Sequence, residues 1–150
     1  MSVLAKEYSD LDRALDEVRS VLHDWSTTLD ETSAPSGETI RYTQLVLHEW
    51  IANLLQHADF AGRSPSIEIR LTTHNRHVTC TVVDNSEGFD LEDRLPERDE
   101  AMEELPERGM GLRIIDACTG ELSYTSPEAG TCRFEFSIPA DHDPWLSMLF

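Results

Sequence analysis

Apolar residues recur at helical spacing in two long segments of the chain. Steps of three and four predict one buried helix face from Leu11, Leu15, Val18, Leu22, Trp25 and Leu29. Ser9 or Asp10 precedes this stripe, and either is a suitable N-cap residue. A second helix is predicted over 38–58, where Trp50 flanks an apolar stripe made of Leu47, Ile51, Leu54, Leu55 and Ala58.

Shorter segments alternate apolar and polar residues at strand spacing. The predicted strands cover residues 3–8, 66–73, 77–83, 121–126 and 131–139. The first is expected at a sheet edge, and turns at 74–76 and 127–130 would make hairpins of the other four. A short helix is expected over 112–118.

This order of elements predicts the fold class. Strands joined by hairpins rather than helical crossovers favour an α/β (α+β) two-layer sandwich, with a mixed, mostly antiparallel sheet and helices on one face. No internal repeat or domain boundary is visible. We therefore expect residues 1–150 to form a single domain, with a core over 3–139 and an apolar tail over 141–150.

The charge of the chain limits its partners. Its 29 Asp and Glu residues outnumber 12 Lys and Arg residues, and the formal net charge is −17. Such a charge disfavours nucleic acid and anionic membranes and favours a partner with a basic patch, although solubility is the more common explanation. No segment is apolar and long enough for a signal peptide or a membrane span, so we expect a cytoplasmic protein.

The three cysteines, Cys80, Cys118 and Cys132, lie in apolar or strand-like contexts without the C-x-x-C spacing of metal sites. We expect reduced thiols in the core.

Three short motifs carry candidate chemistry, and the first lies on the second predicted helix. Glu49 and Asn53 are four residues apart and share a helix face, which His57 continues. An ordinary polar face explains this pattern as well. The functional hypothesis is that Asn53 gives Mg²⁺ an oxygen ligand while Glu49 lies near a terminal phosphate.

The second motif follows the strand over 77–83. Asp84 either forms a turn or accepts a hydrogen bond from an exocyclic amine such as adenine offers, and Gly88, before Phe89, permits close approach of the backbone. Asn85 and Ser86 are candidates for bonds to phosphate or water.

The third motif is a Gly-x-Gly turn at the start of a helix, formed by Arg108, Gly109, Met110, Gly111 and Leu112. Free N–H groups at a helix N-terminus suit phosphate, and Arg108 is a candidate cation for the terminal phosphate. The turn lacks the full P-loop and dinucleotide-fold patterns, which disfavours those two nucleotide folds.

Together, in this order, the motifs resemble the N-box and the two glycine boxes of the GHKL ATPases. Within that superfamily the chain most resembles the stand-alone anti-sigma-factor serine/threonine kinases of bacterial partner-switching systems, over about residues 3–139. The resemblance implies a Bergerat ATP-binding fold with ATP and Mg²⁺ as cofactors. It also places the acidic segment 90–108 at the family's ATP lid.

The resemblance also implies roles and partners. Glu49 would be the catalytic base, Asn53 the Mg²⁺ ligand and Asp84 the reader of adenine, and residues 108–112 would bind phosphates. The partners would be a small STAS-type anti-sigma-factor antagonist, a sigma factor or other output protein, and a second copy in a homodimer. Ser86 departs from the family, which usually has Gly there, and it fits only if the local φ is negative.

Two rival functions stay open. One is an ATP-binding partner-switch module that transfers no phosphoryl group. The other is an acidic interaction protein that binds no nucleotide.

Overall fold

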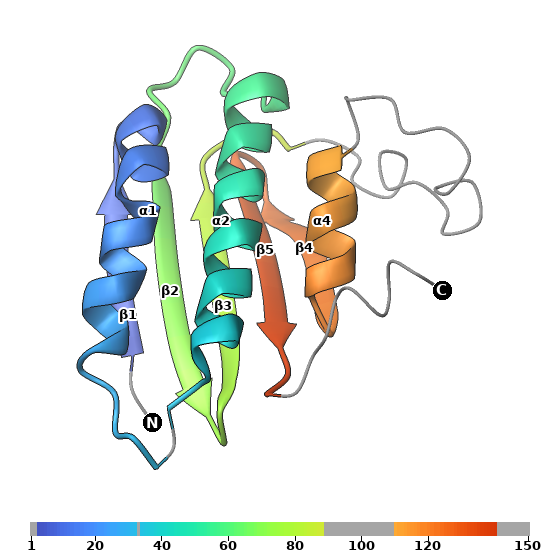
Figure 1. Cartoon of the computed structure of the whole chain (residues 1–150). Coiled ribbons are helices and arrows are strands. Elements are labelled where there is room, and N and C mark those ends of the chain that lie inside the picture. Colours follow the sequence, from blue (N-terminus) through green and yellow to red (C-terminus); the bar gives the residue numbers. More distant parts are fainter. Residues whose placement is uncertain (1–2, 33, 89–109, 141–150) are drawn as a thin grey trace.

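A computed structural model describes residues 3–32, 34–88 and 110–140 of the chain, without the side chains of 110–113 (Figure 1). Its elements are β1 (Val3–Tyr8), α1 (Leu11–Ser26), α2 (Gly37–His57), β2 (Ile67–His74), β3 (His77–Asp84), α4 (Met110–Cys118), β4 (Glu121–Glu128) and β5 (Thr131–Ile138). The strands form one sheet in the order β1-β2-β3-β5-β4. Every pairing between described strands is antiparallel, and β1 lies at an edge, as predicted.

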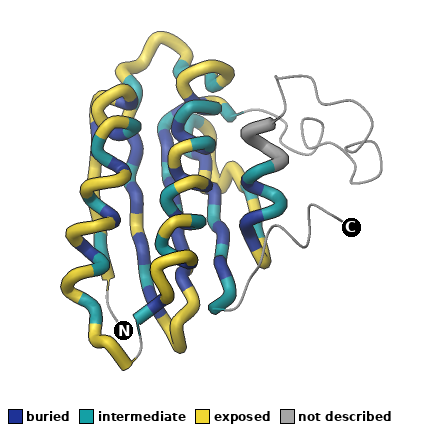
Figure 2. Tube along the Cα trace, in the orientation of Figure 1, coloured by how far each residue is buried: buried dark blue, intermediate teal, exposed yellow. Residues whose placement is uncertain are grey.

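The three described helices, α1, α2 and α4, cover one face of the sheet and lie side by side, which confirms the predicted two-layer sandwich (Figure 1). Buried residues line the interface between the layers, and the exposed ones lie on the outer surfaces (Figure 2). Trp50 is at the centre, with its ring stacked on Phe134 at a centroid distance of 3.9 Å. α2 therefore joins the helical layer to the middle of the sheet.

One residue of the predicted α2 stripe is wrong. Leu55 is 40% exposed, whereas Leu47, Ile51 and Leu54 are buried. The buried face also includes Val46, four residues before Trp50. Leu55 follows Leu54 directly, and about 100° of rotation per residue carries it off the face that meets the sheet.

Side chains define the ends of the helices. Asp10 Oδ1 accepts the N–H groups of Asp12 and Arg13 at 3.0 and 3.3 Å, so Asp10 rather than Ser9 caps α1. α1 ends at Ser26, so Leu29, the last residue of the predicted apolar stripe, lies beyond the helix. The Ser26 and Thr27 hydroxyls each donate to the carbonyl three residues earlier, a local bond that competes with helix continuation.

Turn chemistry explains the two hairpins. Asn75 and Arg76, at the first turn, have φ angles of 49° and 67°, as a tight two-residue hairpin turn requires. β4 extends to Glu128, past the predicted turn start at Pro127. The β4–β5 register is irregular between Thr125 and Glu128, and this irregularity on an edge strand accommodates a proline that cannot donate to the ladder.

The cysteine prediction is confirmed, because all three thiols are free and buried. Burial raises the pKa of the Cys118 thiol to about 11, so it stays protonated at neutral pH.

Candidate functional site

Three segments that are distant in the sequence meet at one end of the sandwich. The last turns of α2, the end of β3 and the first residues of α4 lie at the upper end of the molecule in Figure 1. These segments carry the residues of the three sequence motifs. The antiparallel sheet and the direction of α2 therefore bring Glu49, Asn53 and Asp84 to the same end.

Asp84 is the most unusual polar group at this end. It is 2% exposed at the last position of β3. Its Oδ1 accepts the backbone N–H of Ser86 at 2.8 Å, while Oδ2 is buried and has no hydrogen-bond partner among the described residues. Burial raises the pKa of this carboxyl, and hydrogen bonds from Ser86 partly offset that effect. A buried acceptor without a partner is costly, which makes Oδ2 a candidate acceptor for a donor group on a ligand or an ordered water.

Ser86 fits its position without strain. Among the described residues, the non-glycine positions with positive φ are Ala61, Asn75 and Arg76. The φ of Ser86 is therefore not positive, which is the condition under which a serine fits this position. It is buried, and its hydroxyl accepts the Gly88 N–H at 3.1 Å. Ser86 therefore stabilises the turn after β3 from inside rather than projecting toward solvent.

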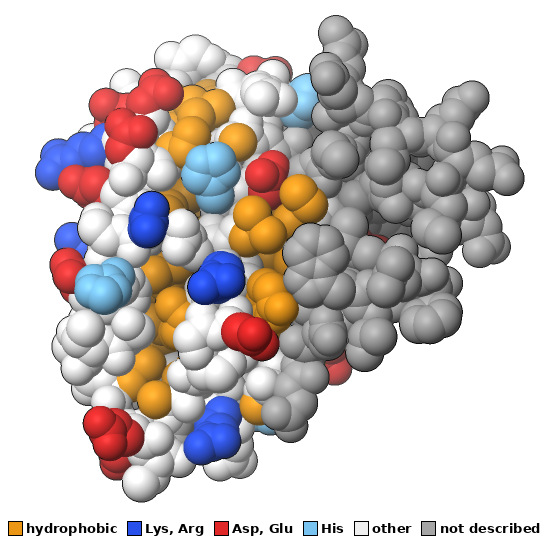
Figure 3. Space-filling view, in the orientation of Figure 1, with side chains coloured by type: hydrophobic (Ala, Val, Ile, Leu, Met, Phe, Trp, Pro, Cys, Tyr) orange, Lys and Arg blue, Asp and Glu red, His pale blue; other side chains and the backbone are white. Residues whose placement is uncertain are grey.

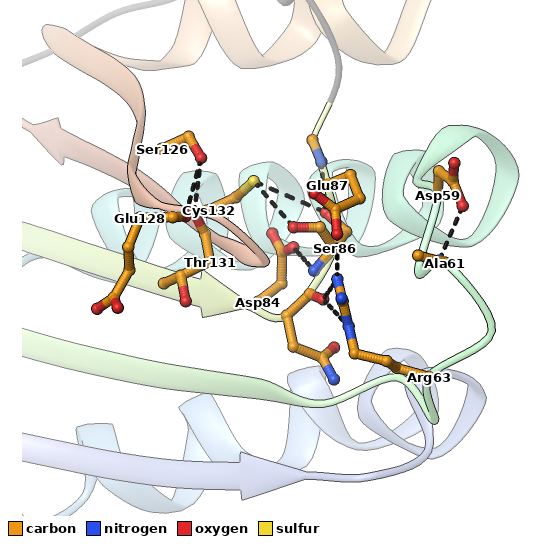
Figure 4. Close-up of polar contacts among 12 residues, drawn as sticks. Asp59, Ala61, Arg63, Asp84, Ser86, Glu87, Ser126, Glu128, Thr131 and Cys132 are labelled. Atoms are coloured by element: carbon orange, nitrogen blue, oxygen red, sulfur yellow. Dashed lines mark hydrogen bonds and ion pairs between the residues drawn. The ribbon is translucent and has the colours of Figure 1, made fainter.

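Gly88 and Cys132 are in close contact beneath this turn. Gly88 has a φ of +80°, and a Cβ added there would lie 2.8 Å from Cys132 Sγ. Cys132 pairs with Asp84 across β3 and β5, and its thiol donates to the Ser86 carbonyl at 3.4 Å. Figure 4 shows the sulfur beside Ser86. Glycine is needed here for its backbone conformation and for the space that the sulfur occupies.

Glu49 and Asn53 lie on α2 as predicted, but their face is not a solvated one. Both are half-buried, and Asn53 Nδ2 is buried without a hydrogen-bond partner among the described residues. The Glu49 side chain is 27% exposed, and His48 Nδ1 lies 3.9 Å from its Oε1, too far for a hydrogen bond. His57, the last residue of α2, is exposed.

Asn85 does not fit its predicted role in phosphate or water binding. Its Oδ1 accepts the Ser66 N–H at 2.8 Å, and its Nδ2 donates to the Ser64 carbonyl at 2.9 Å. Both ends of the amide are thus bonded to the loop between α2 and β2. The reason is geometric: consecutive residues after β3 point to opposite sides, so Asn85 faces away from Asp84 and Ser86.

The second and third motifs lie only partly within the described residues. Phe89, Arg108 and Gly109 fall outside them, as do the acidic segment 90–108 and the tail 141–150. α4 begins at Met110, so Met110, Gly111 and Leu112 belong to its first turn, and the helix starts two residues before the predicted position.

Sequence reasoning missed two residues that shape this end. Arg63 donates two hydrogen bonds to the Asn85 carbonyl, and Cys132 contacts the turn after β3 from β5. Neither belongs to a recognisable motif. Only the strand register, which places Cys132 opposite Asp84, reveals the second contact.

Three further observations concern other parts of the molecule. A cavity of about 410 Å³ lies between α1 and α2, with Arg19, His23 and Arg41 in its lining, and it includes no predicted site residue. The helical face bears scattered charges of both signs (Figure 3). Among the described helices, none has the length and apolar character needed to cross a membrane.

The antiparallel sheet, the helices on one face and the order of the motifs define the class of protein as a GHKL-type α+β sandwich. The sequence profile described as the histidine kinase-like ATPase domain matches residues 8–134, which is most of the chain. The chain therefore belongs to the histidine kinase-like ATPase domain family.

The chain is also similar to individual proteins and solved structures. The serine-protein kinase RsbW of Oceanobacillus iheyensis is 32% identical over 96 residues, or 61% of this chain and 61% of that protein. The match thus spans less than two-thirds of the relative's length. The catalytic domain of histidine kinase ThkA superposes with a TM-score of 0.50 at 16% identity, covering 91% of this chain and 97% of that one. The histidine kinase AdeS of Acinetobacter baumannii has a TM-score of 0.46 at 16% identity, over 94% and 70% of the two chains.

Proposed function

We propose that this protein binds Mg-ATP, phosphorylates a serine or threonine of a small STAS-type anti-sigma-factor antagonist, and sequesters an output protein such as a sigma factor. Family membership and the similarity to a serine-protein kinase support ATP-dependent phosphoryl transfer. The observation that carries the proposal is the unpartnered, buried Oδ2 of Asp84, at the end of the molecule where α2 and α4 also present candidate residues.

Asp84 would select adenine. Its Oδ1 is already bonded to the Ser86 N–H, which leaves Oδ2 as an acceptor for the exocyclic amine of the base. Gly88, whose backbone is left-handed, would let the base approach the main chain. A guanine presents an oxygen at the corresponding position, and two facing acceptors repel each other. The site would therefore prefer ATP to GTP.

Asn53 would hold Mg²⁺ through its carboxamide oxygen. Its amide nitrogen is buried without a partner among the described residues, so the carboxamide has no protein partner there that fixes its orientation. Mg²⁺ suits this position because it takes few protein ligands and keeps waters and phosphate oxygens. When bound, the ion would neutralise phosphate charge. The N-terminal turn of α4, with Gly109 and Arg108 before it, would contact the phosphates.

Glu49 would take the proton of the acceptor hydroxyl. The hydroxyl oxygen forms a bond to the γ-phosphorus, the bond from that phosphorus to the bridging oxygen breaks, and ADP leaves with the electron pair. Glu49 is half-buried and lies one helical turn from Asn53. Among the described residues, its carboxylate accepts no hydrogen bond. Positioning and charge stabilisation supply most of the rate in such transfers.

Nucleotide binding is tested first, by a thermal shift with Mg-ATP. Stabilisation by ATP and not by GTP is expected. The absence of any nucleotide effect would favour the acidic interaction protein instead.

Phosphoryl transfer is tested with γ-labelled ATP and the candidate antagonist encoded by a neighbouring gene. Glu49→Gln should bind ATP normally and lose transfer by about 10²- to 10⁴-fold, the usual contribution of a positioned base. Glu121→Gln, the same chemical change at an exposed residue of β4, is the matched control. Unchanged transfer by Glu49→Gln would exclude it as the base. ATP binding without transfer by the wild type would favour the partner-switch module.

A further inference from the structure

The five residues from Asp84 to Gly88 are held from two opposite sides. Asp84, Ser86 and Gly88 face Cys132, whereas the side chains of Asn85 and Glu87 reach the loop between α2 and β2 (Figure 4). Only the first side belongs to the proposed adenine site. The second side consists of contacts with other parts of the protein, and these contacts hold the turn that carries Asp84.

Backbone bonds fasten the second side at two points. The Asn85 N–H donates to the Ser66 carbonyl at 3.2 Å, and the Glu87 N–H donates to the Asp59 carbonyl at 2.8 Å. The Asn85 side chain adds its bonds to Ser64 and Ser66. The turn that carries Asp84 is thus bonded to the α2–β2 loop on both sides of Ser86.

Arg63 completes this set of contacts with one guanidinium group. Its Nε and Nη2 donate to the Asn85 carbonyl at 3.2 and 2.7 Å, and Nη2 also contacts Glu87 Oε1 at 2.8 Å. The planar guanidinium packs over Gly130 in the β4–β5 turn, where an added Cβ would lie 3.3 Å from Nη2. Arg63 therefore fixes the peptide between Asn85 and Ser86, whose N–H is the donor that orients Asp84 Oδ1.

We propose that Arg63 is a positioning residue that sets nucleotide specificity by holding the Asp84 carboxylate in place from behind the turn. The proposal rests on the proposed function, because it presumes that Asp84 reads the base. Removing Arg63 lets the Asn85–Ser86 peptide rotate. The Ser86 N–H then no longer fixes which carboxylate oxygen is occupied and which one is presented to the base.

The exposure of the Arg63–Glu87 ion pair distinguishes the positioning role of Arg63 from a contribution to the global stability of the fold. The Arg63 and Glu87 side chains are 41% and 43% exposed, and pairs of this kind contribute little to global stability. Its loss should therefore affect the local geometry of the turn more than the melting temperature. A purely structural residue would show the reverse.

The test measures ATP and GTP affinities of Arg63→Ala with Mg²⁺ present. The ratio of the two affinities should fall about five- to tenfold, the effect of one or two hydrogen bonds. Arg133→Ala is the matched control, since Arg133 is also a surface arginine whose ion pair, with Glu135, spans 3.0 Å. Arg63→Lys should restore part of the ratio, because an ammonium can replace one of the donors but not the bidentate fork.

The outcomes are separable from those of the proposed function. Asp84→Ala tests base reading directly, and an unchanged nucleotide preference in that variant would refute the adenine role itself. If Asp84→Ala loses the preference and Arg63→Ala keeps it, the positioning role of Arg63 is wrong while the adenine role stands. The positioning role of Arg63 would also be refuted if Arg63→Ala lost ATP and GTP affinity equally, or if Arg133→Ala changed the affinity ratio by the same factor. If Arg63→Ala does not fold, Arg63→Lys replaces it in the test. A ratio of ATP to GTP affinity in Arg63→Lys equal to that of the wild type would then refute the positioning role.

Discussion

Replacing Asp84 with Asn should reverse the base preference of the site. Oδ1 of Asp84 accepts the Ser86 N–H at 2.8 Å, and Oδ2 has no partner among the described residues. An amide has a single oxygen, which this N–H should retain. The amide nitrogen then takes the position of Oδ2, and it faces the exocyclic amine of adenine as donor against donor. The oxygen of guanine becomes the better partner.

The size of the effect follows from burial. Asp84 is 2% exposed, so water cannot replace the lost bond. A buried hydrogen bond left unmade costs about 1–3 kcal/mol, which corresponds to about 5- to 150-fold in affinity. ATP should bind Asp84→Asn more weakly by that factor, and GTP more tightly. Competition titrations at fixed Mg²⁺ measure both. Retention of the wild-type preference for ATP would refute the assignment of Oδ2 to the base.

The same substitution has a second consequence, for stability. Burial raises the pKa of Asp84 above its ordinary value of 3.8, so between 3.8 and the raised pKa the folded state binds more protons than the unfolded state. Stability therefore falls as pH rises through this window, and the penalty is complete above it. Asn carries no charge and avoids the penalty.

Melting curves at several pH values test the predicted direction of this pH dependence. Asp84→Asn should melt higher than wild type at neutral pH, and the gap should close as pH falls toward 3.8. A gap that widens toward low pH would show that the buried carboxylate stabilises the apo protein. In the wild type, ATP affinity should also fall at low pH, because a protonated Asp84 no longer presents two acceptor oxygens.

Three further substitutions test other parts of the structure. Asn53→Ala should weaken ATP binding with Mg²⁺ present and leave affinity in EDTA unchanged; equal Mg²⁺-dependent affinities for variant and wild type would exclude a metal role. Gly88→Ala should lower both melting temperature and ATP affinity, because the new Cβ meets Cys132 Sγ at 2.8 Å and the φ of +80° costs about 1–2 kcal/mol. Adding Cys132→Ala should restore only part of the loss, and complete restoration would mean that the backbone is not strained. Trp50→Ala removes a side chain with 0% exposure and should cost about 3–5 kcal/mol in denaturant unfolding. A loss below about 1 kcal/mol would contradict the central place of Trp50 in the core.

The positions of the elements were accessible from the sequence because they depend on local periodicity. Alternation and steps of three and four identified every described helix and strand to within a few residues. The predicted ends of elements are wrong where local hydrogen bonding or strand pairing determines the end of a helix or strand. Ser26 and Thr27 end α1 early through bonds to carbonyls, and Pro127 is accommodated by an irregular edge-strand pairing rather than by a turn.

The candidate residues on α2 and after β3 were also found from the sequence, because each motif combines chemistry with spacing. Glu49 and Asn53 share a face of one helix, and Asp84 ends a strand. Their surroundings could not be predicted in the same way. Asn53 is half-buried, and α2, which carries it, packs against α4, which begins more than fifty residues further along the chain.

The sequence by itself determined the elements, the strand-end carboxylate and the order of the motifs, since these depend on neighbours along the chain. The tertiary structure alone decided which side chains hold the turn after β3. Asn85 was a plausible phosphate ligand until strand alternation turned it toward Ser64 and Ser66. Arg63 and Cys132 reach this turn from 22 and 46 residues away. Contacts of such separation are set by the sheet register and the packing of layers, which no local pattern of residues records.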